Sequence, residues 1–131
     1  MKIKIATISR LLLGLIYFVF GLNGFFHFLA MTPPPMSETA TAFFQGIFGS
    51  GYFIPVLSGT QAFGGALLLI GFGAPLALVI LAPVTLHIFL FHLFLTPGLK
   101  NLGLPGFMLI AHLTAASAFW KVYRPLFSKG E

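Results

Sequence analysis

The chain has 131 residues, of which 58% are apolar and 7% are charged, and this composition excludes a soluble globular domain, a disordered chain and a charged coiled coil. It has no cysteine, which excludes disulfides, thiolate metal sites and iron–sulfur clusters. The net charge of +5 comes from basic residues near the chain ends, a placement typical of membrane orientation rather than of nucleic-acid binding.

Four apolar stretches are long enough to cross a bilayer, which takes about 20 mostly apolar residues. They run over about residues 11–31, 52–71, 75–95 and 106–122. The sequence therefore predicts an all-α membrane protein, a four-transmembrane-helix bundle that forms a single membrane domain over residues 1–131. A cleaved signal peptide over residues 1–30 is the alternative, but its apolar run is long for a signal core and no clear A-x-A site follows.

Basic residues in the short flanks predict the orientation of these spans. Six of them lie near the chain ends: Lys2, Lys4, Arg10, Lys121, Arg124 and Lys129. The loops on the opposite side carry a single one, Lys100. Both termini are therefore expected in the cytoplasm, with the chain crossing the cell (inner, cytoplasmic) membrane as a multi-pass protein. The turn at residues 71–74 is nearly too short for anything but a tight hairpin between the second and third spans.

The longest loop, between the first and second spans, contains an amphipathic segment over about residues 38–49. Its apolar residues follow the spacing of one helical face: Ala40, Phe43, Phe44, Ile47 and Phe48. Ser37 is expected to cap this helix and Glu38 to complement its dipole. We predict a short extracytoplasmic helix in the membrane interface, either as a lid over a site beneath it or as a segment simply packed on the end of the bundle.

Polar side chains inside the spans are the most informative feature for function. They are Asn23, His27, Gln61, His87, His92 and His112. At about 1.5 Å per residue, four of them, one on each span, fall within roughly 5 Å of the bilayer midplane, while His27 and His92 lie about 10 Å above it. His87 and His92 point about 140° apart, and His87, one turn after Pro83, is favoured as the inward one. Such residues usually face the bundle interior or a wet cavity, so we expect them to meet.

Three interpretations of this cluster stay open. In the first, it binds a quinone or similar amphipathic molecule, with amide and imidazole groups on its carbonyl oxygens and phenylalanines stacked on its ring. In the second, two histidines hold a haem or another transition metal, which the lack of an acidic residue and of an H-x-x-x-H spacing disfavours. In the third, the residues only hydrogen-bond between helices. The candidate ligand-binding residues are Asn23, His27, Gln61, His87, His112, His92, Phe43, Phe44 and Phe48.

Two longer stretches carry a family resemblance. RLLLGLIYFVFGLNGFFHF, which begins at Arg10, and GTQAFGGALLLIGFGAPLALVILAP, which begins at Gly59, resemble the first three helices of DoxX-like membrane proteins. The resemblance covers most of the chain, to about Tyr123, and implies a four-helix membrane bundle. For some members it also implies a link to thiosulfate:quinone oxidation or to other redox complexes. An acidic residue is common early in the second helix of this family, where this chain has Gln61, and the departure argues against a proton-handling role.

We therefore expect a redox-associated membrane subunit that binds a quinone-like or other lipophilic molecule in a polar pocket of the outer leaflet. The alternative is a non-enzymatic accessory or assembly subunit whose Gly and Ala faces pack against a membrane or redox partner protein. A quinone is the one cofactor suggested, and no metal site is predicted. Whether the chain is an enzyme stays open: no hydrolytic site is expected, because no intramembrane acid pairs with Ser or His, and catalytic residues are not assigned. The other expected partners are the lipid bilayer and further copies of the chain, forming a homo-oligomer, and nucleic acid is not expected.

Overall fold

The computed structural model describes residues 2–28, 37–96 and 98–129, and every regular element within these ranges is a helix. In chain order the elements are α1 (Lys2–Phe26), α2 (Glu38–Gly49), α3 (Phe53–Ile70), α4 (Ala74–Phe94), the 3₁₀ helix η1 (Leu99–Leu102), α5 (Gly103–Ser117), α6 (Trp120–Tyr123) and the 3₁₀ helix η2 (Arg124–Phe127). Across the described ranges, three helices are long and apolar enough to cross a membrane, or four if the bent pair Lys100–Ser117 and Trp120–Phe127 forms one span. The chain thus has the helices of a multi-pass membrane protein.

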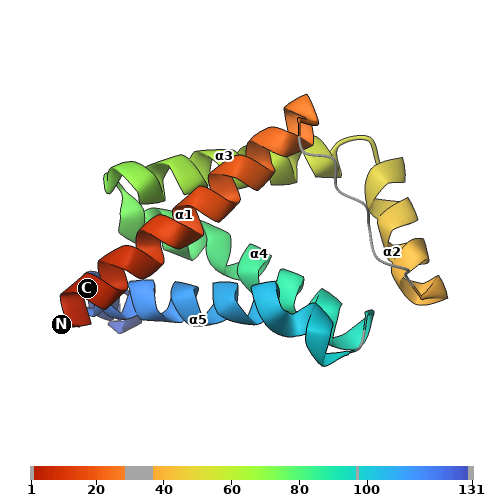
Figure 1. Cartoon of the computed structure of the whole chain (residues 1–131). Coiled ribbons are helices and arrows are strands. Elements are labelled where there is room, and N and C mark those ends of the chain that lie inside the picture. The colour runs from red at the N-terminus through yellow and green to blue at the C-terminus, as the bar shows by residue number, and fades with distance from the viewer. Residues whose placement is uncertain (1, 29–36, 97, 130–131) are drawn as a thin grey trace.

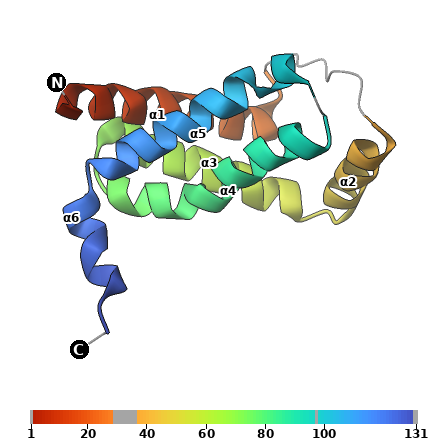
Figure 2. The same cartoon turned by 90° about the horizontal axis from the view of Figure 1, so that it is seen from below.

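The long helices pack into a bundle in which α1 makes the most extensive contacts. It packs along α3 and also against α5, while α4 contacts both α3 and α5. Figure 1 shows α1 running obliquely between α3 and α5, and Figures 1 and 2 both place the two chain ends at one end of the bundle. The helix α2 lies at the opposite end (Figures 1 and 2). Both α1 and α4 therefore join the α3 and α5 sides of the molecule.

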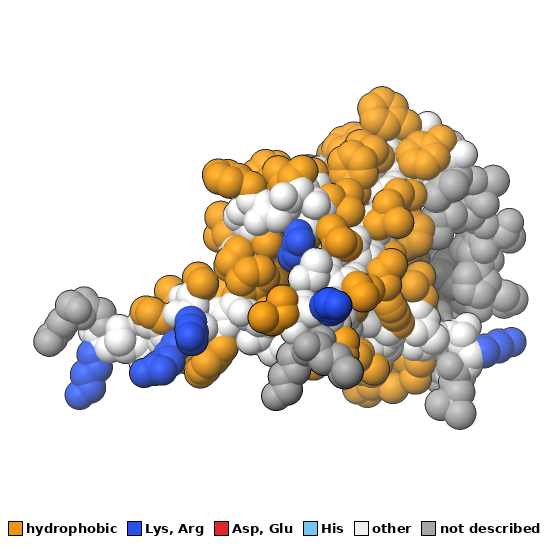
Figure 3. Space-filling model, turned by 60° about the vertical axis from the view of Figure 1, so that its left-hand side comes forward, with side chains coloured by type: hydrophobic (Ala, Val, Ile, Leu, Met, Phe, Trp, Pro, Cys, Tyr) orange, Lys and Arg blue, Asp and Glu red, His pale blue; other side chains and the backbone are white. Residues whose placement is uncertain are grey.

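The interior of the bundle is small and its surface is strongly apolar. The largest fully buried side chains belong to Tyr17, Leu13, Leu68, Leu78, Leu81 and Thr85. Large apolar side chains are also widely exposed, including Ile3 at 78%, Phe72 at 78% and Phe94 at 70%. Hydrophobic side chains cover much of the face seen in Figure 3. Soluble monomers rarely expose so much contiguous apolar surface, whereas a surface of this kind suits contact with lipid.

Glycines set the close approach of α1 and α3. A Cβ added at Gly21 would lie 2.3 Å from the backbone nitrogen of Ala62, and one added at Gly65 would lie 2.4 Å from that of Phe18. No real Cβ contact is that short, so the two backbones can meet this closely only because both residues lack a side chain. The small residues of α1 and α3 are therefore used for packing inside the chain.

The predicted tight hairpin between the second and third spans is confirmed. Gly71 (φ +84°) and Gly73 (φ +68°) both adopt the left-handed conformation that glycine tolerates without steric cost. An Arg10 Nη1–H donates to the carbonyl oxygen of Leu68, in the last turn of α3. A cation is stabilised at a helix C-terminus by the unsatisfied carbonyls there, so Arg10 fixes the start of the hairpin to α1.

The predicted helix over residues 38–49 is also confirmed, with the cap that the sequence indicates. The Ser37 Oγ accepts a hydrogen bond from the Ala40 N–H at 3.2 Å and donates one to the carbonyl oxygen of Leu95 at 2.8 Å. The rings of Phe43 and Phe44 lie 5.5 Å and 5.0 Å from the ring of Phe91, measured between centroids. These contacts dock α2 on the end of α4.

Two of the predicted spans differ from the helices of the structure at their boundaries. The first helix begins at Lys2, because no Gly or Pro interrupts residues 2–10, and it ends at Phe26, before the predicted end at residue 31, because His27 leaves the helical conformation (φ +52°). The predicted fourth span, residues 106–122, is not one continuous helix. The helix α5 begins earlier, at Gly103, and ends at Ser117, where the axis bends by 72° before α6. The N–H groups of Ala118 and Phe119 bond to carbonyls three residues back, which tightens and ends the helix.

Candidate functional site

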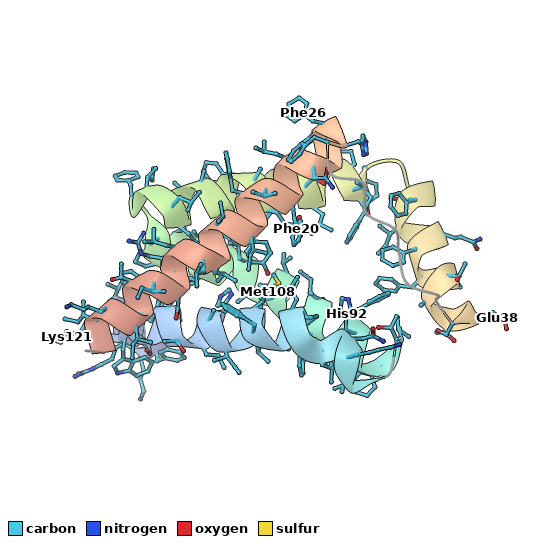
Figure 4. The ribbon with its side chains drawn as sticks, in the orientation of Figure 1. Phe20, Phe26, Glu38, His92, Met108 and Lys121 are labelled. Atoms are coloured by element: carbon cyan, nitrogen blue, oxygen red, sulfur yellow. The ribbon has the colours of Figure 1, made fainter. Side chains whose placement is uncertain are left out.

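A cavity of about 300 Å³ lies between α1, α3, α4, η1 and α5. Its lining residues are Tyr17, Phe20, Gln61, Ile88, His92, Lys100, Asn101, Leu104, Pro105 and Met108. Figure 4 shows Phe20, His92 and Met108 around the space that separates α1 from α5. The lining is mainly apolar with a few polar side chains, which is the usual composition of a small-molecule site.

The polar groups Lys100 and Asn101 reach the cavity from the connection between α4 and α5. An Asn101 Nδ2–H donates to the carbonyl oxygen of Thr96 at 3.0 Å, and the Thr96 hydroxyl donates to the carbonyl oxygen of His92 at 3.3 Å. These two bonds tie the connection back to the last turn of α4. Lys100, which is exposed, and Asn101 thus line the same cavity as His92.

Histidine 92 has a defined hydrogen-bonding role in this lining. Its Nδ1 lies 2.7 Å from the carbonyl oxygen of Ile88, one turn earlier in α4. A carbonyl oxygen only accepts, so Nδ1 carries the proton in the neutral imidazole and Nε2 is left as an acceptor. The His92 Nε2 is therefore suited to accept a hydrogen bond from a hydroxyl group of a ligand.

A buried chain of three side chains lies next to the cavity and starts at Tyr17. The His112 Nε2 is 2.8 Å from the carbonyl oxygen of Leu78, so Nε2–H donates there and Nδ1 accepts. The Thr85 hydroxyl, 2.8 Å from that Nδ1, donates to it, and the Tyr17 hydroxyl, 2.5 Å from the Thr85 Oγ1, donates to Thr85. Each of these three side chains thus has a hydrogen-bond partner, and the bonds join α1, α4 and α5 in the core.

The cavity brings together only two of the nine candidate residues, Gln61 and His92. The expectation that His87 is the inward histidine is corrected, because His87 is exposed and lines a shallower groove of about 190 Å³ together with Phe43. His112 is buried but bonded to Thr85 and Leu78, outside the lining. For His112, the interpretation that the polar residues only hydrogen-bond between helices is therefore the one that fits.

The remaining candidates lie elsewhere. Asn23 is half-buried in α1, and its carbonyl oxygen accepts the N–H of His27 at 2.8 Å. His27 is exposed and has a positive φ of 52°, because the helix ends at Phe26 and the chain turns there, so the two residues no longer share one helical face. Phe44 and Phe48 pack on each other and, through Phe44, on Phe91, away from the cavity lining.

The sequence and structure comparisons give no relative. No known family model matches the chain, and no curated protein or solved structure does so either. The DoxX-like resemblance therefore stays a prediction that depends on the two quoted stretches alone.

Most of the cavity lining, including Tyr17, Lys100 and Asn101, was not predicted from the sequence. A signal for each was present: Tyr17 places a hydroxyl in the middle of an apolar span, and Lys100–Asn101 is a polar pair directly before the last span. Among the residues that the structure describes, no three His, Asp or Glu side chains come close enough together to hold a metal ion.

Proposed function

We propose that this chain is a membrane protein of DoxX-like type, associated with redox chemistry, that binds a quinone-like or other lipophilic molecule in the cavity between α1 and α5. The proposal includes a four-span bundle in a cytoplasmic membrane with both termini inside. It places α2 and the Lys100 end of the cavity in the outer half. The basic residues at the chain ends and the single one in the opposite loops support this orientation.

The observation that carries the proposal is the mixed lining of the cavity. At about 300 Å³ it has room for one aromatic head group, with an apolar tail leaving toward lipid. Phe20 and Met108 offer apolar contacts for a ring, and Gln61 and His92 offer hydrogen bonds at its edge.

Both redox forms of a quinone would find partners there. An amide N–H of Gln61 can donate to a quinone carbonyl oxygen, and the His92 Nε2 can accept from the hydroxyl group of a quinol. The cation of Lys100 would further favour an oxygen atom that carries negative charge. This set of groups binds and orients an oxygen-bearing ring, and does not by itself supply a redox centre.

The accessory-subunit alternative receives less support from the packing. It relied on Gly and Ala faces being free for a partner protein, but Gly14, Gly21 and Gly65 are each within contact distance of the opposite helix of the α1–α3 pair. These faces are occupied inside the chain. A partner would have to bind through the exposed apolar surface, which the lipid bilayer also covers.

A binding experiment with matched variants tests the proposal. In detergent, the purified chain should bind a short-chain ubiquinone analogue, and His92→Ala and Gln61→Ala should each weaken binding by roughly tenfold, the value of one hydrogen bond of about 1.4 kcal/mol. His87→Ala is the control and should leave binding unchanged, because its side chain is exposed outside this cavity.

Two results would contradict the proposal. One is equal loss of binding in His87→Ala and His92→Ala, which would show that the quinone analogue does not use this cavity. The other is the absence of any lipophilic molecule, by mass spectrometry, from protein purified out of native membranes, together with a partner protein in constant ratio. That combination would favour the accessory subunit.

A further inference from the structure

The C-terminal residues form an arm that leaves the bundle at a sharp angle. We define the C-terminal arm as Trp120–Lys129, which comprises α6, η2 and the two residues after it. Its axis is bent by 72° from that of α5, and Figure 2 shows it projecting from the end of the bundle where α1 begins. The arm therefore runs across the direction of the spanning helices at one end of the molecule.

Two anchors hold the arm at this angle. At its base, Phe119 is partly buried against the core cluster that contains Met108 and Ala115. One turn further on, the Tyr123 hydroxyl donates to the carbonyl oxygen of Pro75 at 2.6 Å, which ties the arm to the first turn of α4. The orientation of the arm is thus set by contacts with the bundle and not by the bend alone.

The arm has an apolar side and a basic side. Trp120, Tyr123 and Phe127 are spaced three and four apart, and the rings of Trp120 and Phe127 lie 5.8 Å apart between centroids. Lys121 and Arg124, three apart, lie beside these apolar residues, with Arg124 bordering them four residues after Trp120, and Lys129 follows; all three basic side chains are exposed. Figure 3 shows basic side chains along the projecting arm with hydrophobic ones beside them.

We propose that the C-terminal arm lies on the bilayer surface at this end of the bundle and binds the anionic headgroups of phospholipids through Lys121, Arg124 and Lys129. The charges are complementary, because residues 120–129 contain three basic side chains and no acidic one. The exposed apolar side chains of the arm, such as Phe127 at 77%, would enter the acyl boundary. This proposal does not depend on the ligand of the cavity.

A bilayer fits the arm better than a nucleic acid or an acidic protein does. The arm is joined directly to the end of an apolar helix that would span the membrane, so a bilayer surface is always within its reach. A soluble acidic partner would satisfy the basic side but would leave Trp120, Val122 and Leu126, each more than half exposed, in water.

The chain offers a direct probe of this proposal, because Trp120 is its only tryptophan. The full chain is reconstituted into phosphatidylcholine vesicles that contain an equal fraction of brominated phosphatidylcholine or brominated phosphatidylglycerol, and the quenching of Trp120 fluorescence is compared. Both lipids should quench, with a preference for phosphatidylglycerol of at least about fivefold in relative association, which is the effect of a single basic residue at the surface. High salt should reduce the preference.

The matched variants separate the two sides of the arm. Replacing the three basic residues together, Lys121→Gln, Arg124→Gln and Lys129→Gln, should abolish the preference and keep the quenching by brominated phosphatidylcholine. Lys100→Gln, at the other end of the molecule, should keep the preference.

Equal quenching of the unaltered chain by the two lipids would overturn the role of the headgroups. Emission typical of an indole in water, with no quenching by either lipid, would overturn the membrane contact and favour a soluble acidic partner.

Discussion

At the scale of single residues, Thr85 has the most demanding position in the described core. It is 2% exposed, and its one hydroxyl group accepts from Tyr17 and donates to His112. The carbonyl of Leu78 fixes the tautomer of His112, and this in turn fixes which group donates in each hydrogen bond between Tyr17, Thr85 and His112. Removing the Thr85 hydroxyl would leave the Tyr17 hydroxyl and the His112 Nδ1 without their buried partner. Removing the Tyr17 hydroxyl would leave the bond between Thr85 and His112 intact.

This difference predicts an order of stability. Thr85→Val keeps the side-chain shape and should lower the free energy of unfolding by about 1–2 kcal/mol, and Tyr17→Phe should cost less. Denaturant unfolding in detergent, followed by circular dichroism, measures both. Thr114→Val is the control, since its hydroxyl bonds only the Ile110 carbonyl of its own helix at 2.8 Å. Equal losses for Thr85→Val and Thr114→Val would show that the buried chain is not a stabilising unit.

The choice between His87 and His92 shows what could be predicted from sequence at this scale. The helix α4 is apolar on all sides, so the hydrophobic pattern does not set its rotation, and Pro83 was a poor guide. The buried residues Leu78, Leu81 and Thr85 are spaced three and four apart, and His92 lies seven residues beyond Thr85, on the same face. The small or polar residues Ala74, Ala77 and Thr85 are also buried on the packed side of α4, and that signal would have selected His92.

At the scale of elements, the contact between α1 and α3 depends on missing side chains. Gly21→Ala would place a methyl group 2.3 Å from the Ala62 nitrogen, so the helices would have to separate. We expect a loss of about 2 kcal/mol or more in the same unfolding assay. Gly106→Ala in α5 is the control, because nothing lies within 4 Å of its added Cβ, and helix propensity should make it neutral or slightly stabilising. Similar results for the two variants would contradict close packing at Gly21.

Element boundaries were predictable where glycine or proline marks them. The hairpin at Gly71 and Gly73 and the cap of α2 at Ser37 follow from local chemistry, and both were predicted correctly. The end of α5 was not, because no Gly or Pro stands between Ser117 and Trp120. The helix ends there through tertiary contacts, the burial of Phe119 and the anchoring of Tyr123 on Pro75, which no local pattern reports.

At the scale of the whole molecule, similar depth in the membrane did not suffice to assemble a site. Depth along the helix axis was the basis for grouping six polar residues, yet only Gln61 and His92 line the cavity. Which side chains meet depends on the rotation of each helix and on how the helices cross. Figure 1 shows α1 running obliquely to α5, residues of both helices line the cavity, and the glycine contacts bring α1 close to α3.

The proposed topology makes a prediction about accessibility, and the absence of cysteine from the chain makes the test free of background. Single cysteines replace three exposed residues, Gln45 on α2, Phe72 in the hairpin and Ser128 near the C-terminus, and a membrane-impermeant maleimide is added to intact cells. If α5 crosses the membrane, Gln45→Cys should be labelled from outside, and Phe72→Cys and Ser128→Cys only in opened membranes. The 15 residues of α5 extend about 22 Å, short of a full hydrocarbon core of about 30 Å, so η1 must help to complete the span. Labelling of Ser128→Cys from outside, with Phe72→Cys protected, would mean that α5 turns back within the membrane and that the chain has three spans.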